Sequence, residues 1–197
     1  MAGRRRAALA VKTGEGGIMA EEQRLQSTTV FDGKLLKVRV DTVRLPDGSE
    51  RKREVVEHPG AVGILPVLPD GQFILVRQYR YAVGREMLEI PAGTREPDEG
   101  PEECAHRELR EETGYVAPEL KEMTRFFVSP GWATEELIIY FATDVVPGPP
   151  APADDEFLEI VQVRPEDVVH LIRDGDIADS KSIIALLGFL GVFLPAV

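Results

Sequence analysis

The nine residues RELREETGY, numbered 107–115, carry three glutamates at spacings of three and four residues. An α-helix turns by about 100° per residue, so Glu111 and Glu112 lie about 60° and about 40° to either side of Glu108. All three carboxylates then share one face of a helix. Like charges at these spacings destabilise a bare helix by roughly 0.2–0.5 kcal/mol per pair. The stretch is therefore either a solvated acidic stripe or a site that attracts cations.

The residues around this stretch predict a strand, a loop and a helix. The strand-like run MLEI at 87–90 leads into a loop that contains proline and glycine, and a helix is expected to begin near Glu99 or Pro101. Gly114 is expected to end that helix, because glycine readily adopts the left-handed conformation at a helix C-terminus. On the helix, Arg107 is expected to point away from the face that carries the glutamates.

Apolar and alternating runs on both sides predict an α/β fold. PDG sequences at 46–48 and 69–71 are turn signals, and each lies between two strand-like runs. The central runs are apolar enough for strands buried on both faces. Strands are expected within 34–45, 49–58, 61–68, 72–81, 122–128, 136–146 and 157–163, and two further helices within 165–175 and 178–190.

Composition limits the ligands that the chain can bind. The 197 residues carry a formal net charge of −11, and because residues 1–18 hold four basic residues and one acid, the rest carries −14. A nucleic-acid-binding surface would normally show a basic excess, so no nucleic acid is expected as a partner. A polyanionic small molecule could still bind through metal ions.

Cysteine and histidine are too sparse for several kinds of site. Cys104 is the single cysteine, so no disulfide can form within the chain, which suits a reducing cytoplasm. It lies in a helical run and is expected to be a small buried packing residue. The three histidines are scattered, so a structural zinc site is not expected. A bound metal should be a hard ion held by oxygen.

Neither end of the chain predicts export or membrane insertion. The basic head, residues 1–22, lacks the long apolar core of a signal peptide and is expected to be disordered, with Met19 an alternative start. Residues 183–197 hold no charged side chain, but a spanning helix needs about 20 residues. A buried or dimer-facing helix is expected there, with no membrane partner.

The acidic stretch belongs to a longer pattern, whose fixed positions are Gly93, Glu99, Arg107, Glu108, Leu109, Glu111, Glu112 and Gly114. This pattern resembles the Nudix box. Only the last position of the pattern differs from the family's preference, since Tyr115 stands where that family prefers an aliphatic residue. This difference is expected to affect packing more than chemistry. The pattern makes the metal site the preferred interpretation of the acidic stretch.

The resemblance implies an α/β/α sandwich with a mixed β-sheet and a divalent metal ion, Mg²⁺ or alternatively Mn²⁺. It implies that Glu108 and Glu112 are the main ligands, that Glu111 is an additional one, and that the backbone carbonyl of Ala92 contributes. Mg²⁺ prefers near-octahedral oxygen ligands and is often shared between carboxylates and substrate phosphates. Arg107 is expected to act at the catalytic site by orienting a glutamate.

Features outside the box resemble one subfamily, the ADP-ribose pyrophosphatases. Pro130 follows Tyr115 by fifteen residues, and REVVEHPGAV, VRQYR, EIPAG and GDIADSKSIIALL are also similar to that group. The reaction implied is Mg²⁺-dependent hydrolysis of ADP-ribose to AMP and ribose 5-phosphate. The alternatives are hydrolysis of another nucleoside diphosphate sugar or of a dinucleotide, or, in a different class, a Nudix domain that senses a nucleotide without cleaving it.

The same resemblance implies roles for residues outside the box. Arg80 matches a phosphate-contacting arginine, Arg53 and Glu54 match positions that contact the adenosine half, and Glu135 matches an acid near the substrate. The catalytic base is expected outside the box, because carboxylates that bind metal have their charge committed. Glu156 is the preferred candidate, followed by Glu159 and then Glu135.

These patterns divide the chain into three parts. Residues 1–22 are expected to form the basic extension, residues 23–57 a small N-terminal antiparallel β layer, and residues 58–197 the Nudix hydrolase domain. The N-terminal layer has too little apolar material to be stable by itself. It is therefore expected to help form a homodimer.

Overall fold

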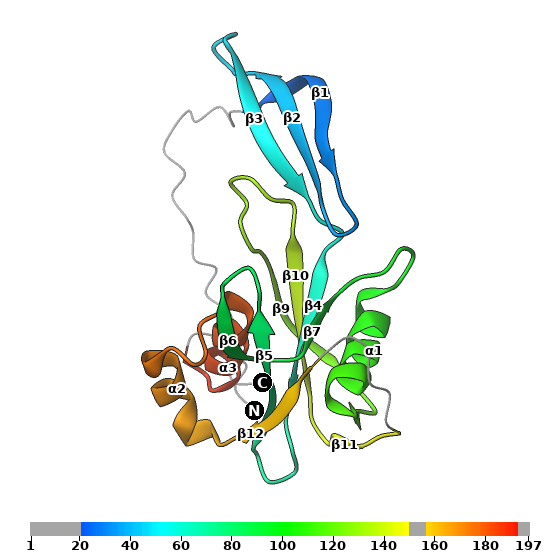
Figure 1. Cartoon of the computed structure of the whole chain (residues 1–197), viewed down its shortest axis with the longest axis vertical. Helices are drawn as coiled ribbons and strands as arrows, with labels where there is room; N and C mark the ends of the chain where they lie inside the picture. Colours follow the sequence, from blue (N-terminus) through cyan, green and yellow to red (C-terminus); the bar gives the residue numbers. More distant parts are fainter. Residues whose placement is uncertain (1–20, 150–156, 193–197) are drawn as a thin grey trace, which may run out of the picture.

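A computed structural model describes residues 21–149 and 157–192 of the chain. A three-stranded sheet stands apart from a larger body in which strands lie between helices (Figure 1). Most of the predicted basic extension, residues 1–20, lies outside the described residues.

The N-terminal sheet consists of β1 (Gln23–Asp32), β2 (Lys37–Arg44) and β3 (Glu50–Glu57), paired antiparallel in the order β1-β2-β3. The turn between β2 and β3 contains Gly48 at φ 85°, a conformation that glycine adopts without strain. Of all the residues in these strands, only Asp41 and Val43 are buried. The sheet therefore has almost no core of its own.

The larger body contains two main sheets. The order of the first is β7-β4-β10-β9, in which β4 and β10 run parallel and the other neighbours antiparallel. The second is antiparallel with the order β12-β5-β6, and a two-stranded sheet pairs β8 with β11. The bounds are β4 Ala61–Pro66, β5 Phe73–Arg80, β6 Arg85–Glu89, β7 Ala92–Thr94, β8 Tyr115–Val116, β9 Lys121–Phe127, β10 Glu136–Ala142, β11 Val146–Pro147 and β12 Glu159–Val163.

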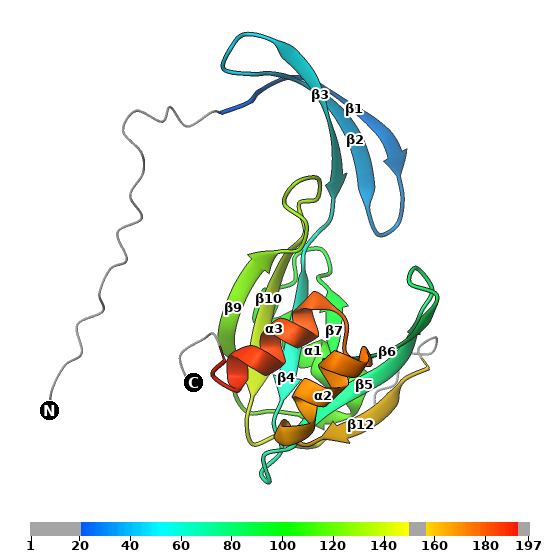
Figure 2. The same cartoon turned by 90° about the vertical axis from the view of Figure 1, so that its left-hand side faces the viewer.

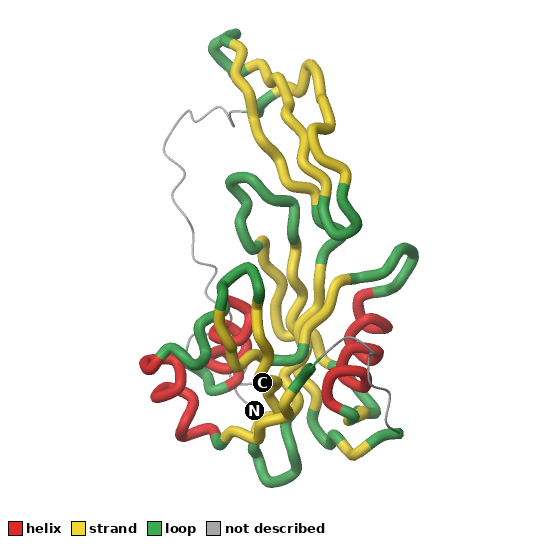
Figure 3. Tube along the Cα trace, in the orientation of Figure 1, coloured by secondary structure: helices red, strands yellow, loops and turns green. Residues whose placement is uncertain are grey.

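Helices cover both faces of these sheets. They are α1 (Pro101–Thr113), the short 3₁₀ helix η1 (Pro165–Asp167), α2 (Val168–Asp174) and α3 (Ser180–Phe189). In Figure 2, α2 and α3 lie in front of the sheets and α1 lies behind them. Figure 3 separates helices, strands and loops by colour. No described helix is long and apolar enough to cross a membrane.

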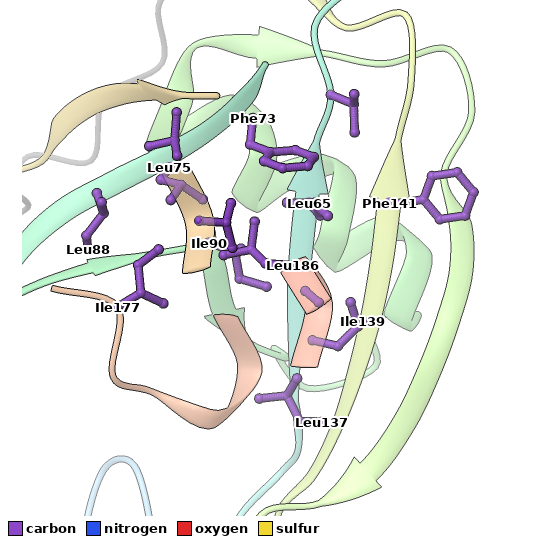
Figure 4. Packing of buried hydrophobic residues seen from close by; sticks show 14 of the residues in the cluster. Leu65, Phe73, Leu75, Leu88, Ile90, Leu137, Ile139, Phe141, Ile177 and Leu186 are labelled. Atoms are coloured by element: carbon purple, nitrogen blue, oxygen red, sulfur yellow. The ribbon is translucent and has the colours of Figure 1, made fainter. Parts of the chain in front are cut away.

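Alternation along the central strands creates a core on each face. In β10, Ile139 packs in the cluster that includes Leu186 of α3, whereas Ile138 packs in the cluster that includes Leu109 of α1. Successive side chains of a strand point to opposite faces, so a strand covered on both sides must be apolar throughout. Figure 4 shows the α3 side, where Leu65, Phe73, Leu75 and Leu186 gather. The predicted α/β/α sandwich with a mixed sheet is confirmed.

Candidate functional site

Helix α1 begins and ends where the sequence predicts. Gly100 is the extended N-cap residue, Pro101 opens the helix, and Glu102 and Glu103 place negative charge in the first turn, where the helix dipole favours it. Gly114 caps the C-terminus at φ 71°, and its backbone N–H donates to the carbonyl of Arg110. The acidic stretch therefore lies on one continuous helix.

Packing of α1 decides where its glutamates point. Cys104, Ala105 and Leu109 are fully buried against the sheet, and this fixes the rotation of the helix about its axis. Glu108 and Glu112 are consequently buried as well, with 9% and 7% of their surface exposed. Burial of charged groups is costly unless they are paired, so these carboxylates need positive partners.

The backbone before α1 is shaped around these two carboxylates. Oε2 of Glu112 accepts a hydrogen bond from the backbone N–H of Ala92, at 2.9 Å. A Cβ atom built on Gly93 would overlap the carboxylate of Glu108. Only glycine leaves room for that carboxylate, which gives a physical reason for glycine at the first position of the box.

Arg107 ties the glutamates together. Its Nε and Nη2 donate to the two carboxylate oxygens of Glu99 at 2.7 and 2.9 Å, and its Nη1 donates to Glu108 at 2.6 Å and to Glu111 at 3.2 Å. The prediction that Arg107 points away from the glutamates is wrong. Its long side chain folds back over the helix surface, so the direction of its Cα–Cβ bond does not decide where the guanidinium lies.

Two pKa values reflect this network. Hydrogen bonds from Arg107 lower the pKa of Glu99 to about 2. Burial raises the pKa of the Cys104 thiol to about 12, so Cys104 is not a nucleophile at neutral pH. The prediction of a buried packing cysteine is confirmed.

The donor set fits a hard divalent cation. The carboxylates of Glu99, Glu108 and Glu111 contact one guanidinium, and Glu112 lies beside them, so negative charge exceeds what Arg107 alone can neutralise. All donors are oxygens, as Mg²⁺ and similar ions prefer. Within residues 21–149 and 157–192, no three acidic, histidine or cysteine side chains converge as they would around an ion. Instead, Nη1 of Arg107 contacts both Glu108 and Glu111.

A second charged group lies beside the box. Nε and Nη2 of Arg80 donate to the two oxygens of Glu89, both at 2.8 Å, and Lys181 donates to Glu89 and, at 2.9 Å, to Asp179. Burial by itself would raise the pKa of Glu89, but Arg80 and Lys181 keep it below its ordinary value. The charge of Glu112 helps to raise the pKa of Arg80, after the larger effect of Glu89, so this group and the box are electrostatic neighbours.

This second group lines a pocket of about 490 Å³. Its volume is within the range of small-molecule sites, and it combines charged residues with apolar ones. The lining residues are Tyr79, Arg80, Tyr81, Ala82, Val83, Met87, Glu89, Asp179 and Lys181.

Sequence reasoning did not assign roles to Glu89 or Lys181. Glu89 is 1% exposed, although it stands in the apolar run MLEI, and a charged residue in such a run is the signal that could have found it. Lys181 is distant in sequence but belongs to the start of α3, which is joined to this strand because the hydroxyl of Ser182 accepts from the backbone N–H of Ile90 at 2.9 Å.

The candidate adenosine-binding residues lie on the N-terminal sheet. Arg53 and Glu54 are neighbours on β3, and Arg53 pairs with Glu22 at 2.5 Å. In Figure 1 this sheet projects away from the part of the molecule that carries α1. The single chain therefore places them on a different sheet from the strands next to the box.

The loop that carries Glu135 is joined to the end of β3. The backbone N–H of Val56 donates to the carbonyl of Trp132 at 2.8 Å, and that of Thr134 donates to the carbonyl of Val56 at 2.9 Å. The hydroxyl of Thr134 also accepts from the backbone N–H of His58 at 3.0 Å. Glu135 follows directly, so it lies near the junction between the two parts of the molecule.

Of the two preferred candidates for the base, the structure describes only Glu159. Glu156 lies outside the described residues. Glu159 is the first residue of β12, and its side chain is 70% exposed beside Arg77, at 3.6 Å.

Comparison with family models divides the chain in two. Residues 57–186 match the NUDIX domain, and residues 22–56 match the nucleoside diphosphate sugar hydrolase N-terminal domain. The chain belongs to the Nudix family, and it is a hydrolase of that family. Nudix hydrolases in general need a divalent metal ion.

Several relatives match over most of their length. An ADP-ribose pyrophosphatase from Bacillus subtilis (strain 168) is 40% identical over 168 residues, which is 84% of this chain and 91% of the relative. A methanol dehydrogenase activator from Bacillus methanolicus is 36% identical, over 86% and 93% of the two chains. A crystal structure of an ADP compounds hydrolase superposes with a TM-score of 0.77 at 25% identity, covering 90% of this chain and 97% of that one.

Proposed function

We propose that this chain catalyses the Mg²⁺-dependent hydrolysis of the pyrophosphate bond of ADP-ribose, giving AMP and ribose 5-phosphate. The names of its relatives support this substrate, since ADP-ribose pyrophosphatases from Bacillus subtilis and Mycobacterium tuberculosis (strain ATCC 25618 / H37Rv) are 40% and 34% identical to it. The observation that carries the proposal is the group of carboxylates on α1, held beside Ala92 and Gly93.

In this proposal, Glu108 and Glu112 hold the metal, with Glu111 and the carbonyl of Ala92 as further ligands. A bound divalent ion supplies positive charge against phosphate oxygens and makes water more acidic. Arg107 holds Glu108 in place through the hydrogen bond at 2.6 Å and thereby orients a ligand. We take Mg²⁺ as the metal ion, with Mn²⁺ as the alternative.

The remaining roles fall to residues outside the box. Arg80 binds a phosphate of the substrate, because its guanidinium is partly exposed on the pocket beside the box. Glu156 accepts the proton of the attacking water, with Glu159 and then Glu135 as the alternatives for this role.

The N-terminal sheet, residues 23–57, is proposed to pair with a second copy of the chain, while residues 58–197 form the catalytic domain. The support is the exposure of large apolar side chains on β1, notably Val30 at 58% and Phe31 at 55%. In such a dimer, Arg53 and Glu54 contact the adenosine half of the substrate. Light scattering is expected to give twice the mass of the 21.8 kDa chain, and a monomer at micromolar concentration would refute the dimer. The enzyme is expected in the cytoplasm.

A second candidate function is hydrolysis of another nucleoside diphosphate sugar. The GDP-mannose pyrophosphatase of Yersinia enterocolitica serotype O:8 / biotype 1B is 34% identical over 145 residues, which is 68% of this chain. The sensing function is disfavoured, because every charged position of the box is filled.

A substrate panel tests the proposal. We expect kcat/KM to be highest for ADP-ribose when it is compared with GDP-mannose, UDP-glucose, diadenosine polyphosphates and NADH, each with Mg²⁺ and with EDTA. Another substrate ahead by more than tenfold would overturn the substrate assignment. Nucleotide binding without any cleavage would identify a sensor instead.

A further inference from the structure

The pocket beside the box contains a buried acid that a metal site does not explain. Glu89 is 1% exposed, and its carboxylate contacts two cations that come from different parts of the fold, Arg80 at the end of β5 and Lys181 at the start of α3. A buried carboxylate with partners on both sides is fixed in position. The three side chains are therefore one preorganised unit.

The geometry leaves Arg80 able to bind an anion. A guanidinium has five N–H donors in a planar fork, and Glu89 accepts from Nε and from Nη2. The two N–H groups on Nη1 and the second one on Nη2 point away from Glu89. Because the Arg80 side chain is 40% exposed whereas Glu89 and Lys181 are 1% and 11% exposed, Arg80 is the member of the unit that a ligand can reach.

We propose that Glu89 and Lys181 are positioning residues that hold the guanidinium of Arg80 in the orientation that binds the substrate's pyrophosphate. This inference rests on the proposed function and extends it to two residues that act through a third. Glu89 fixes the plane of the guanidinium through the paired hydrogen bonds. Lys181 neutralises part of the charge of Glu89, so that Arg80 keeps positive charge for phosphate.

Asp179 completes the unit from its far side. It caps α3 by accepting from the backbone N–H of Ser182 at 3.0 Å, and the same oxygen accepts from Lys181. Lys181 is thereby held at the start of the helix and directed to Glu89. Asp179 balances the charge of Lys181, and Glu89 holds Arg80, so the substrate meets a guanidinium whose donors have a fixed direction.

A double-mutant cycle tests this inference. Arg80→Ala is expected to lower kcat/KM by about 10- to 150-fold through lost charge-assisted hydrogen bonds. Glu89→Gln is expected to lower it by about tenfold, mostly through KM, because the guanidinium is no longer held. In the Arg80→Ala background, Glu89→Gln should lower kcat/KM by less than about threefold, since its effect passes through Arg80.

Further variants separate positioning from general structural damage. Lys181→Gln should also raise KM, and, like Glu89→Gln, it should have little further effect in the Arg80→Ala background. Lys181→Arg keeps the positive charge, so it should retain most of the wild-type activity. Lys181→Gln also provides the test if Glu89→Gln does not fold. Glu122→Gln is the matched control, because Glu122 accepts a similar fork from Arg125 at 2.9 and 2.7 Å on β9, and its kcat/KM should not change.

The outcomes separate this inference from the proposed function. An equal effect of Glu89→Gln with and without Arg80, or wild-type kcat/KM in both Glu89→Gln and Lys181→Gln, would overturn the inference. The ratios of kcat/KM between variant and wild type are measured on the substrate with the highest kcat/KM in the panel. The test therefore applies even if that substrate is not ADP-ribose. If the chain cleaves none of them, the same cycle is measured as the Kd of α,β-methylene-ADP-ribose by calorimetry, and a chain that does not bind this probe overturns both proposals.

Discussion

Gly93→Ala should damage the box without removing any of its charged groups. The added Cβ would overlap the carboxylate of Glu108, which is buried and held by Arg107 at 2.6 Å. The carboxylate must therefore move or the backbone must shift. Overpacking of this kind costs about 1–3 kcal/mol of folding stability, which is about 2–12 °C in Tm for a chain of this size.

The effect on activity should be larger than the effect on folding. Misplacing a metal ligand typically costs about 10- to 100-fold in metal affinity or activity, so we expect kcat/KM to fall by that factor and the Mg²⁺ concentration for half-maximal activity to rise. Thermal unfolding and Mg²⁺ titrations of activity measure the two effects. Gly131→Ala is the matched control, because nothing lies within 4 Å of a Cβ built there. Wild-type Mg²⁺ dependence in Gly93→Ala would refute the reasoning.

Three further predictions concern single acids. Glu112→Gln removes a ligand charge, so kcat should fall by about 100-fold or more with an unchanged circular dichroism spectrum, and wild-type turnover would refute its role. Glu156→Gln should lower kcat by about 10²–10⁴-fold with little change in KM or Mg²⁺ dependence, and if Glu159→Gln alone has this effect, Glu159 is the base. Glu99 has its pKa lowered from 4.5 to about 2, so the stability that it contributes is complete above about pH 5 and is lost as the pH falls towards 2. Urea unfolding should show that the free energy of unfolding of the wild-type chain falls by on the order of 3 kcal/mol more than that of Glu99→Gln between pH 5 and pH 2. An equal dependence of the free energy of unfolding on pH in both proteins would count against this explanation.

Local patterns predicted the central elements well because their causes are local. The run at 61–68 is apolar on both faces, and β4 is buried throughout Ala61–Pro66. Gly114 ends α1 as expected, because the left-handed conformation that it adopts costs glycine little. Spacing alone also placed Glu108 and Glu112 on one face of that helix, and the structure brings both beside β7.

Contacts between segments that are far apart along the chain could not be predicted from the sequence. Lys181 meets Glu89 across 92 positions, through the packing of α3 against the sheet, and no periodicity encodes that contact. The direction of Arg107 depends on Glu99 in the preceding loop, whose path a helical projection does not include. The parallel pairing of β4 with β10, which sets Leu137 opposite Ala61, likewise depends on the whole topology.

The hydrogen bonds between Val56 and the loop at 129–135 have a consequence for motion. They fasten the end of β3 to the segment that carries Trp132 and Glu135. A rotation of the N-terminal sheet about residues 58–60 would have to break these bonds or carry the loop with it. Residues as far apart in sequence as Glu54 and Glu135 would then be displaced together, and amide exchange at Val56 and Thr134 would report on a single opening event.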